Sequence, residues 1–109
     1  MIQATLRMNF SAQKIDEALH ILRSIIERTR AEAGCISCSV FQDRENELWV
    51  VYEEKWMNDE GMQRHLRSED YKKVLLVMEM AMTTPEIRFD TISSTRGIET
   101  IEEARIKKT

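Results

Sequence analysis

The 109-residue chain has few of the residues that build common nucleotide and metal sites. With only three glycines and one proline it has no glycine-rich loop to cradle phosphates, and the usual fingerprints of NAD, ATP and flavin binding are missing. It also shows neither a nucleophile elbow nor a paired set of metal ligands. The sequence therefore predicts no cofactor and no metal, and any chemistry must come from the substrate and ordinary side chains.

Cysteine is nearly absent as well, and the two that occur form a single C-x-x-C, Cys35 and Cys38. A zinc site would need a second pair of ligands, which the chain does not provide. Residues 35–42 are expected to form a strand, on which side chains three apart point to opposite faces, unlike a redox pair at a helix start. We therefore expect two small buried or half-buried side chains rather than a redox or zinc centre.

Long apolar runs and clusters of basic charge are also missing. The longest apolar runs, residues 48–52 and 74–78, are far too short to span a bilayer, and no signal segment opens the chain, so we expect a cytoplasmic protein without a membrane partner. The net charge of −3, with no basic stripe, argues against nucleic acid as a partner. With 42% hydrophobic and 32% charged residues, one soluble globular domain is expected.

Hydrophobic periodicity predicts four strands and three helices, with period two in the first strand and helical spacing in the first helix. The expected elements are a strand at 2–10, a helix at 12–32, strands at 35–42 and 48–56, helices at 59–66 and 69–82, and a strand at 87–93. Ser11, Asn58 and Ser68 are the expected helix N-caps. Gly34 can end the first helix with a positive φ, and Pro85 follows the last helix.

This order of elements is that of a ferredoxin-like α+β domain, a split β-α-β with a four-stranded antiparallel sheet. Its helices lie on one face of the sheet and leave the other face open. The strand at 48–56 carries apolar side chains on both sides, with Trp49 and Val51 on one of them. A homodimer through the sheet face is the simplest way to cover such a surface.

The domain is expected to span residues 1–93, followed by a tail at 94–109. The tail holds Ile98, Ile101 and Ile106 among charged residues, so it is expected to form a short helix or an arm on a partner subunit.

Three segments resemble the antibiotic biosynthesis monooxygenase family: GCIS at 34–37, YEEKW at 52–56 and HLRS at 65–68. The resemblance covers roughly residues 2–93. It implies a dimeric α/β barrel of two ferredoxin-like subunits, each with a pocket between its helices and its sheet. Some members oxygenate polycyclic phenols or quinols without metal or flavin, whereas others degrade haem or isomerise small phosphorylated sugars.

With this resemblance, His65 is the candidate catalytic residue. A histidine can take a phenolic proton near neutral pH, and cofactor-free oxygenation needs that step because the electron-rich phenolate reacts with oxygen. The alternative is a histidine at a helix end that bonds the backbone or caps a turn.

Five residues are candidates for substrate binding: Asn9, Tyr52, Trp56, Tyr71 and Met78. Asn9 lies on the more polar face of its strand, where it could polarise a quinone oxygen or meet a partner subunit. Tyr52 and Trp56 share a strand face, and packing of the sheet on the short helix is the alternative role for Trp56. Tyr71 and Met78 fall on one helix face with Leu75 and Met82, which predicts either core or an adaptable pocket wall.

The sequence favours a cofactor-independent monooxygenase that oxidises a small or polycyclic quinol or phenol with molecular oxygen. One alternative is a non-catalytic dimeric ligand-binding or stress-related module, so whether the chain is an enzyme stays open. Another is an isomerase of a small phosphorylated sugar, with Arg64, Arg67 and Arg88 as candidates for basic groups at the pocket mouth. Haem cleavage is disfavoured, because Leu75 stands where haem-degrading relatives carry their haem-binding histidine.

Overall fold

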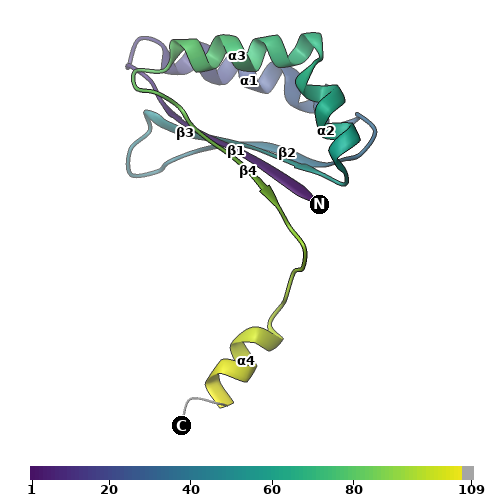
Figure 1. Ribbon diagram of the computed structural model, residues 1–109. Helices are drawn as coiled ribbons and strands as arrows, with labels where there is room; N and C mark the ends of the chain where they lie inside the picture. Colours follow the sequence, from purple (N-terminus) through teal and green to yellow (C-terminus); the bar gives the residue numbers. More distant parts are fainter. Residues whose placement is uncertain (107–109) are drawn as a thin grey trace.

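The computed structural model describes residues 1–106. Its elements are β1 (Ile2–Asn9), α1 (Ile15–Arg30), β2 (Cys35–Gln42), β3 (Trp49–Trp56), α2 (Asp59–Leu66), α3 (Glu69–Met80), β4 (Glu86–Thr91) and α4 (Glu99–Ile106). The strands form one antiparallel sheet in the order β2-β3-β1-β4. Helices α1, α2 and α3 lie together on one face of the sheet (Figure 1), so the predicted ferredoxin-like α+β fold is confirmed. None of the described helices is long and apolar enough to cross a membrane.

The core lies between the sheet and the pair α1 and α3. Alternate residues of β1 and β3 point towards the helices, and the helical spacing of α1 and α3 turns an apolar stripe towards the sheet. Its deeply buried side chains include Leu6, Met8, Phe10, Leu22, Ile25, Val50, Val74 and Val77. A bidentate pair between Arg28 of α1 and Asp70 of α3, with N–O distances of 2.9 and 3.0 Å, joins the two helices at the surface.

Two glycines place α2 close to the end of β3. Gly34 has the predicted positive φ, +89°, and its carbonyl accepts a hydrogen bond from the Met57 N–H at 2.7 Å. At Gly61, an added Cβ would lie 2.9 Å from the carbonyl oxygen of Ala33 and 3.3 Å from the Trp56 ring. Only glycine therefore allows this close approach of α2.

The predicted caps of the two later helices are confirmed, whereas that of α1 was wrong. Asn58 accepts a hydrogen bond from the N–H of Gly61, and Ser68 accepts one from the N–H of Tyr71. At the start of α1 the carbonyl of Ser11 instead accepts from residues 14 and 15, so residues 11–14 form a turn. Helix α1 consequently begins at Ile15, with Lys14 as an N-cap that makes no side-chain hydrogen bond. Helices α1 and α3 and strand β4 each end about two residues earlier than predicted.

The two cysteines lie on the same face of the sheet, so their predicted opposite orientation was wrong. A β-bulge between Cys35 and Ser37 shifts the register of β2, so that Cys35 pairs with Trp56 and Cys38 with Glu54. Because Trp56 and Glu54 share a face of β3, both thiols are on the helix side. Both are free, Cys38 buried and Cys35 half-buried, as expected of small packing residues.

Helix α3 buries a different stripe from the predicted one. Its buried residues are Tyr71, Val74 and Val77, while Leu75 is 47% exposed. Met82 lies beyond the helix end and is exposed. The buried residues are those on the side of α3 that packs on α1, and the sequence alone does not show which side that is.

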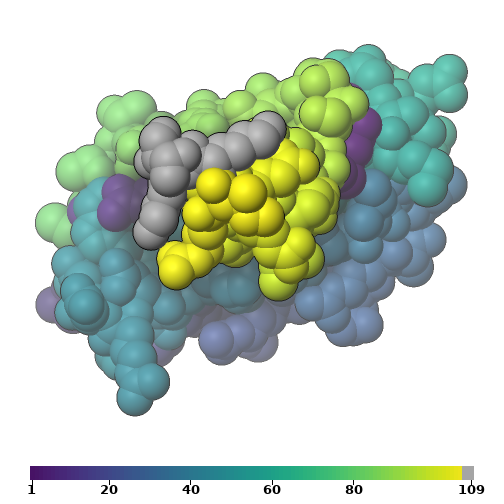
Figure 2. Space-filling view, turned by 90° about the horizontal axis from the view of Figure 1, so that it is seen from below, coloured from purple at the N-terminus to yellow at the C-terminus, as the bar shows by residue number. Residues whose placement is uncertain are grey.

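Residues 92–106, called the arm below, leave the domain after β4. Figure 1 shows α4 on the side of the sheet opposite the other helices, and Figure 2 shows it from below, in front of the sheet. No residue of α4 is buried. The radius of gyration is 16.5 Å, against about 13 Å for a compact chain of this length. The arm is thus a projection of the molecule and adds nothing to the core.

Candidate functional site

The end of β3 carries a buried carboxylate between two aromatic residues. Tyr52, Glu54 and Trp56 alternate along the strand and therefore share its helix side. Glu54 is only 1% exposed. A buried carboxylate is strongly unfavourable unless it is paired and hydrogen-bonded, so the partners of Glu54 define the site.

Both oxygens of Glu54 are engaged. Oε2 accepts a hydrogen bond from the Tyr52 hydroxyl at 2.7 Å and lies 2.8 Å from Nε2 of His65. Oε1 accepts from the indole Nε1 of Trp56 at 3.0 Å. Three donors from β3 and α2 thus converge on one carboxylate.

His65 lies between two carboxylates. Its Nε2 faces Glu54, and its Nδ1 lies 2.8 Å from Oε2 of Glu32, just beyond the end of α1. A carboxylate accepts, so each ring nitrogen must donate, and only the charged imidazolium has two donors. The ring is fully buried; the ring of Trp56 lies 5.0 Å away and that of Tyr71 meets it edge-on at 5.4 Å.

The electrostatics agree with a charged ring. Burial works against the charge, but the hydrogen bond and charge of Glu54, together with those of Glu32, outweigh it and raise the pKa of His65 above its ordinary 6.5. Burial and the charge of Glu54 raise the pKa of Tyr71 to about 12, and the same two causes raise the pKa of Tyr52. Both phenols therefore stay protonated at neutral pH.

The contacts form one continuous chain from the sheet to the surface. The Cys38 thiol donates to the Tyr52 hydroxyl at 3.3 Å, Tyr52 donates to Glu54, and His65 joins Glu54 to Glu32. Burial raises the pKa of Cys38 to about 12, so its thiol stays protonated. Only the carboxylate of Glu32 reaches solvent, with 26% of its side chain exposed.

We call Glu32, His65 and Glu54 the proton cluster. It holds one positive and two negative charges, so one added proton would make the cluster neutral. Because the three groups interact strongly, that proton belongs to the cluster rather than to one residue. The arrangement can therefore act as a base, with Glu32 as its accessible end.

The structure brings four of the six predicted site residues together. His65, Tyr52 and Trp56 contact Glu54 directly or through its hydrogen bonds, and Tyr71 lies against the His65 ring. The ring nitrogens of His65 contact carboxylates, and not the backbone or a turn as in the predicted alternative.

Asn9 and Met78 lie elsewhere. The Asn9 side chain accepts hydrogen bonds from the backbone and hydroxyl of Thr83. It pairs with Trp49, at the far end of β1 from the Ile2–Trp56 pair, about 23 Å along the strand at 3.3 Å per residue. Met78 lies about two helical turns beyond Tyr71, half-buried against the core. Substrate contacts of these two residues stay predictions.

Sequence reasoning missed both carboxylates of the cluster. Glu54 had a signal, because a charged residue between Tyr52 and Trp56 on a strand face meant for the core is unusual. Glu32 had none, since it lies 33 residues from His65 and reaches it only in the fold.

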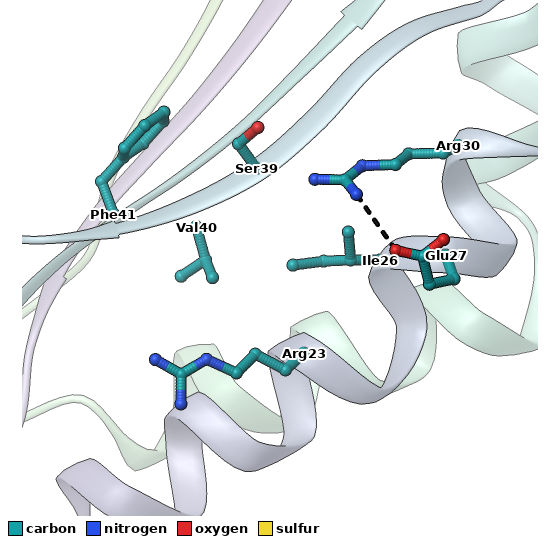
Figure 3. A pocket seen from close by; sticks show the side chains of 7 residues that line it. All are labelled: Arg23, Ile26, Glu27, Arg30, Ser39, Val40 and Phe41. Carbon is teal, nitrogen blue, oxygen red and sulfur yellow. Dashed lines mark hydrogen bonds and ion pairs between the residues drawn. The ribbon is translucent and has the colours of Figure 1, made fainter.

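A groove of about 430 Å³ lies between α1 and β2, away from the proton cluster (Figure 3). We call it the α1–β2 groove, and its lining residues are Arg23, Ile26, Glu27, Arg30, Ser39, Val40 and Phe41. The arginines predicted for a phosphate-binding mouth do not line it. Arg64 donates to the carbonyl of Ala33, and Arg88 pairs with Asp90 on β4.

The fold and the buried cluster define a ferredoxin-like α+β domain with an aromatic-lined histidine–carboxylate centre between helices and sheet. Residues 1–75 match the antibiotic biosynthesis monooxygenase family, and the chain belongs to that family. No curated protein matches the chain.

Solved structures share the fold. An antibiotic biosynthesis monooxygenase is 20% identical with a TM-score of 0.76 and covers 86% of this chain and 100% of its own. A protein from Deinococcus radiodurans is 21% identical with a TM-score of 0.80, covering 90% and 98%. A conserved protein from Methanosarcina mazei Go1 is 28% identical with a TM-score of 0.75, covering 82% and 89%. The family and these likenesses support a monooxygenase-type domain without specifying a substrate.

Proposed function

We propose that the protein is a cofactor-independent monooxygenase of a small or polycyclic quinol or phenol, with the proton cluster as its base. Family membership supports the reaction class. The observation that carries the proposal is the buried His65 held between Glu54 and Glu32 at 2.8 Å each. A buried charged centre of this kind is a functional-site candidate because such groups concentrate where proton transfer occurs.

In this proposal the substrate hydroxyl gives its proton to the cluster, and the electron pair of the broken O–H bond stays on the substrate. The resulting phenolate supplies the electrons that reduce molecular oxygen. One oxygen atom enters the substrate, which supplies all four electrons and loses two hydrogens; the other leaves as water with the proton held by the cluster and the second proton lost by the substrate. Trp56 and Tyr71 lie beside the His65 ring and are themselves buried, so in this proposal the substrate meets the cluster at the partly exposed carboxylate of Glu32.

A second candidate is a non-catalytic dimeric ligand-binding module. The observation that favours it is the closure of the site: the His65 ring has no exposed surface, and both nitrogens are occupied by carboxylates. In that case the cluster only holds α2 against the end of β3.

Oxygen uptake by the purified, colourless protein separates the two candidates. The panel holds quinols and anthrones, and the informative variant is Glu32→Gln, because this side chain lies at the accessible end of the cluster. The matched control is Glu27→Gln, the same change on the neighbouring surface of α1, where the side chain is 85% exposed.

Uptake above autoxidation that falls about tenfold or more in the Glu32 variant, but not in the control, supports the oxygenase. Uptake equal to the protein-free rate across the panel refutes it in favour of the binding module.

We also propose a homodimer through the face of the sheet opposite α1 to α3, called the open face. Trp49 and Val51 of β3 lie on it, half-buried, and the guanidinium of Arg7 stacks over the Trp49 ring at 3.9 Å. The face also carries the Arg7–Glu86 pair, so it combines apolar and charged groups. Such a mixture is typical of protein–protein interfaces.

A further inference from the structure

The arm ends in a helix that lacks a partner surface. Ile98, Ile101 and Ile106 are 69%, 61% and 77% exposed. Positions 98, 102 and 106 follow one another at a spacing of four, so Glu102 lies in the same row as two of the isoleucines, with Ile101 beside it. Isolated helices of this length are marginal in water. The apolar side of α4 therefore needs another surface to pack against.

The α1–β2 groove combines apolar and charged side chains, as the apolar side of α4 does. Ile26 and Val40 lie between the side chains of Arg23 and Arg30, and Phe41, which is 54% exposed, projects from β2 on the side away from α1 (Figure 3). Ile26 and Val40 thus form the floor, and guanidinium groups form the borders.

The charges of the two surfaces are complementary. Arg30 is already engaged, donating to the Cys38 carbonyl at 2.9 Å and to Glu27 at 3.1 Å. Within residues 1–106, the side chains of Arg23 and Glu102 make no hydrogen bond or ion pair. A carboxylate in the apolar row of α4 therefore matches an unpaired guanidinium at the border of the groove.

The sheet topology places the groove at the edge opposite the arm. The edges are β2 and β4; the groove lies beside β2, and the arm leaves from β4. Three strand spacings, roughly 14 Å, separate these edges within one copy. The arm does not turn back towards its own groove and projects on the open-face side (Figure 1).

A second copy resolves this separation. When two sheets pack open face to open face about a two-fold axis parallel to their strands, left and right exchange, and β4 of one copy lies across from β2 of the other. Each arm then starts at the edge that holds the other copy's groove.

We propose that α4 of each copy packs into the α1–β2 groove of a second copy, with Ile98 and Ile101 on the apolar floor and Glu102 facing Arg23. This inference rests on the homodimer proposed above. It adds a contact, called the clasp below, between α4 of one copy and the groove of the other. Because the contact is reciprocal, each dimer contains two such clasps.

A charge swap on the full-length chain tests the contact, read as the dimer dissociation constant by sedimentation equilibrium. Glu102→Arg or Arg23→Glu alone should raise the Kd about tenfold or more, since like charges then meet. The double variant should restore most of the affinity. Glu103→Arg and Arg67→Glu make the same charge changes away from the proposed contact and should leave the Kd within about twofold.

A cross-link gives a direct readout that does not depend on affinity. Chains carrying Arg23→Cys are mixed with chains carrying Glu102→Cys and oxidised, and the disulfide between positions 23 and 102 is mapped by peptide mass spectrometry. The mixture should form it, and neither variant alone can.

The outcomes separate the two proposals. A wild-type chain that stays monomeric at about 100 µM overturns the homodimer and the clasp together. If a dimer forms but its Kd is unchanged in both single charge variants and the mixture gives no cross-link, the clasp alone is overturned. Weakening by each single change, rescue by the double variant and the mapped disulfide support it.

Discussion

Replacing Glu54 by glutamine tests the physical account of the buried cluster. The amide keeps the shape of the carboxylate but puts an NH2 group where an oxygen accepted hydrogen bonds. One side of the group faces the Trp56 indole N–H and the other faces Tyr52 and His65. With the NH2 group towards Trp56 a donor meets a donor, and with it towards Tyr52 and His65 it is accommodated only if His65 gives up its proton; in either case the charged His65 loses one of its two carboxylates.

The expected loss follows from these two effects. An unsatisfied buried donor costs about 1–3 kcal/mol, and breaking a buried charge pair costs about 3–5 kcal/mol. The effects overlap at one side chain, so we expect Glu54→Gln to lower the free energy of unfolding by about 3–5 kcal/mol in total. This is a large share of the roughly 5–15 kcal/mol that holds a domain together. Urea unfolding followed by tryptophan fluorescence and far-ultraviolet circular dichroism measures it.

Glu53→Gln is the matched control. Glu53 is the next residue on β3, points to the open face and accepts a hydrogen bond from Gln3 at 3.2 Å in a half-buried position. Its loss should stay below about 1 kcal/mol. Equal losses in the two variants would refute the reasoning, because burial of the charge would then have no energetic consequence.

Three further predictions concern the surroundings of the cluster. The folded-state pKa of His65 lies above its ordinary value of 6.5. The stability that its charge contributes is therefore complete below about pH 6.5 and is lost as the pH rises through the raised pKa. In His65→Gln, the unfolding free energy measured against pH should fall less steeply over this pH range than in the wild-type protein. Gly61→Ala should lower the melting temperature, since its Cβ would lie 2.9 Å from a backbone carbonyl, whereas Gly97→Ala, which meets only a flexible side chain, should not. The buried thiol of Cys38, with a pKa of about 12, should resist alkylation at pH 8 in the native state and react once unfolded; rapid labelling of the native chain, mapped by mass spectrometry, would contradict its burial.

The fold was accessible from the sequence because its signals are local. Period-two alternation in β1, the Asn58 and Ser68 caps, and the positive φ of Gly34 each depend on a few neighbouring residues. Apart from the cap of α1, which a local turn at residues 11–14 displaces, the predictions failed where the decisive contact is not local. The bulge after Cys35, which turns both cysteines to one face, is a property of how β2 pairs with β3.

The site residues show the same difference between local signals and distant contacts. The strand period places Tyr52 and Trp56 on one face, and the family resemblance points to His65, so these residues could be predicted before the structure. Glu32 could not, because the contact with His65 depends on where the end of α1 meets α2. The unpredicted Glu32 changes the chemistry of the site, because a histidine between two carboxylates is a charged member of a cluster rather than a free neutral base.

The two candidate functions make the same prediction for Glu54 and His65, because either role requires these buried groups to be paired. Loss of activity in those variants would therefore not identify a base. Glu32 separates the functions, since its side chain is partly exposed and its replacement leaves Glu54 still bound to His65. A base needs that accessible carboxylate to take up the proton, whereas a purely structural cluster loses only one surface-facing pair. A Glu32→Gln protein that stays folded but loses oxygen uptake would assign the cluster to proton transfer, and one that stays folded with unchanged uptake would assign it to structure.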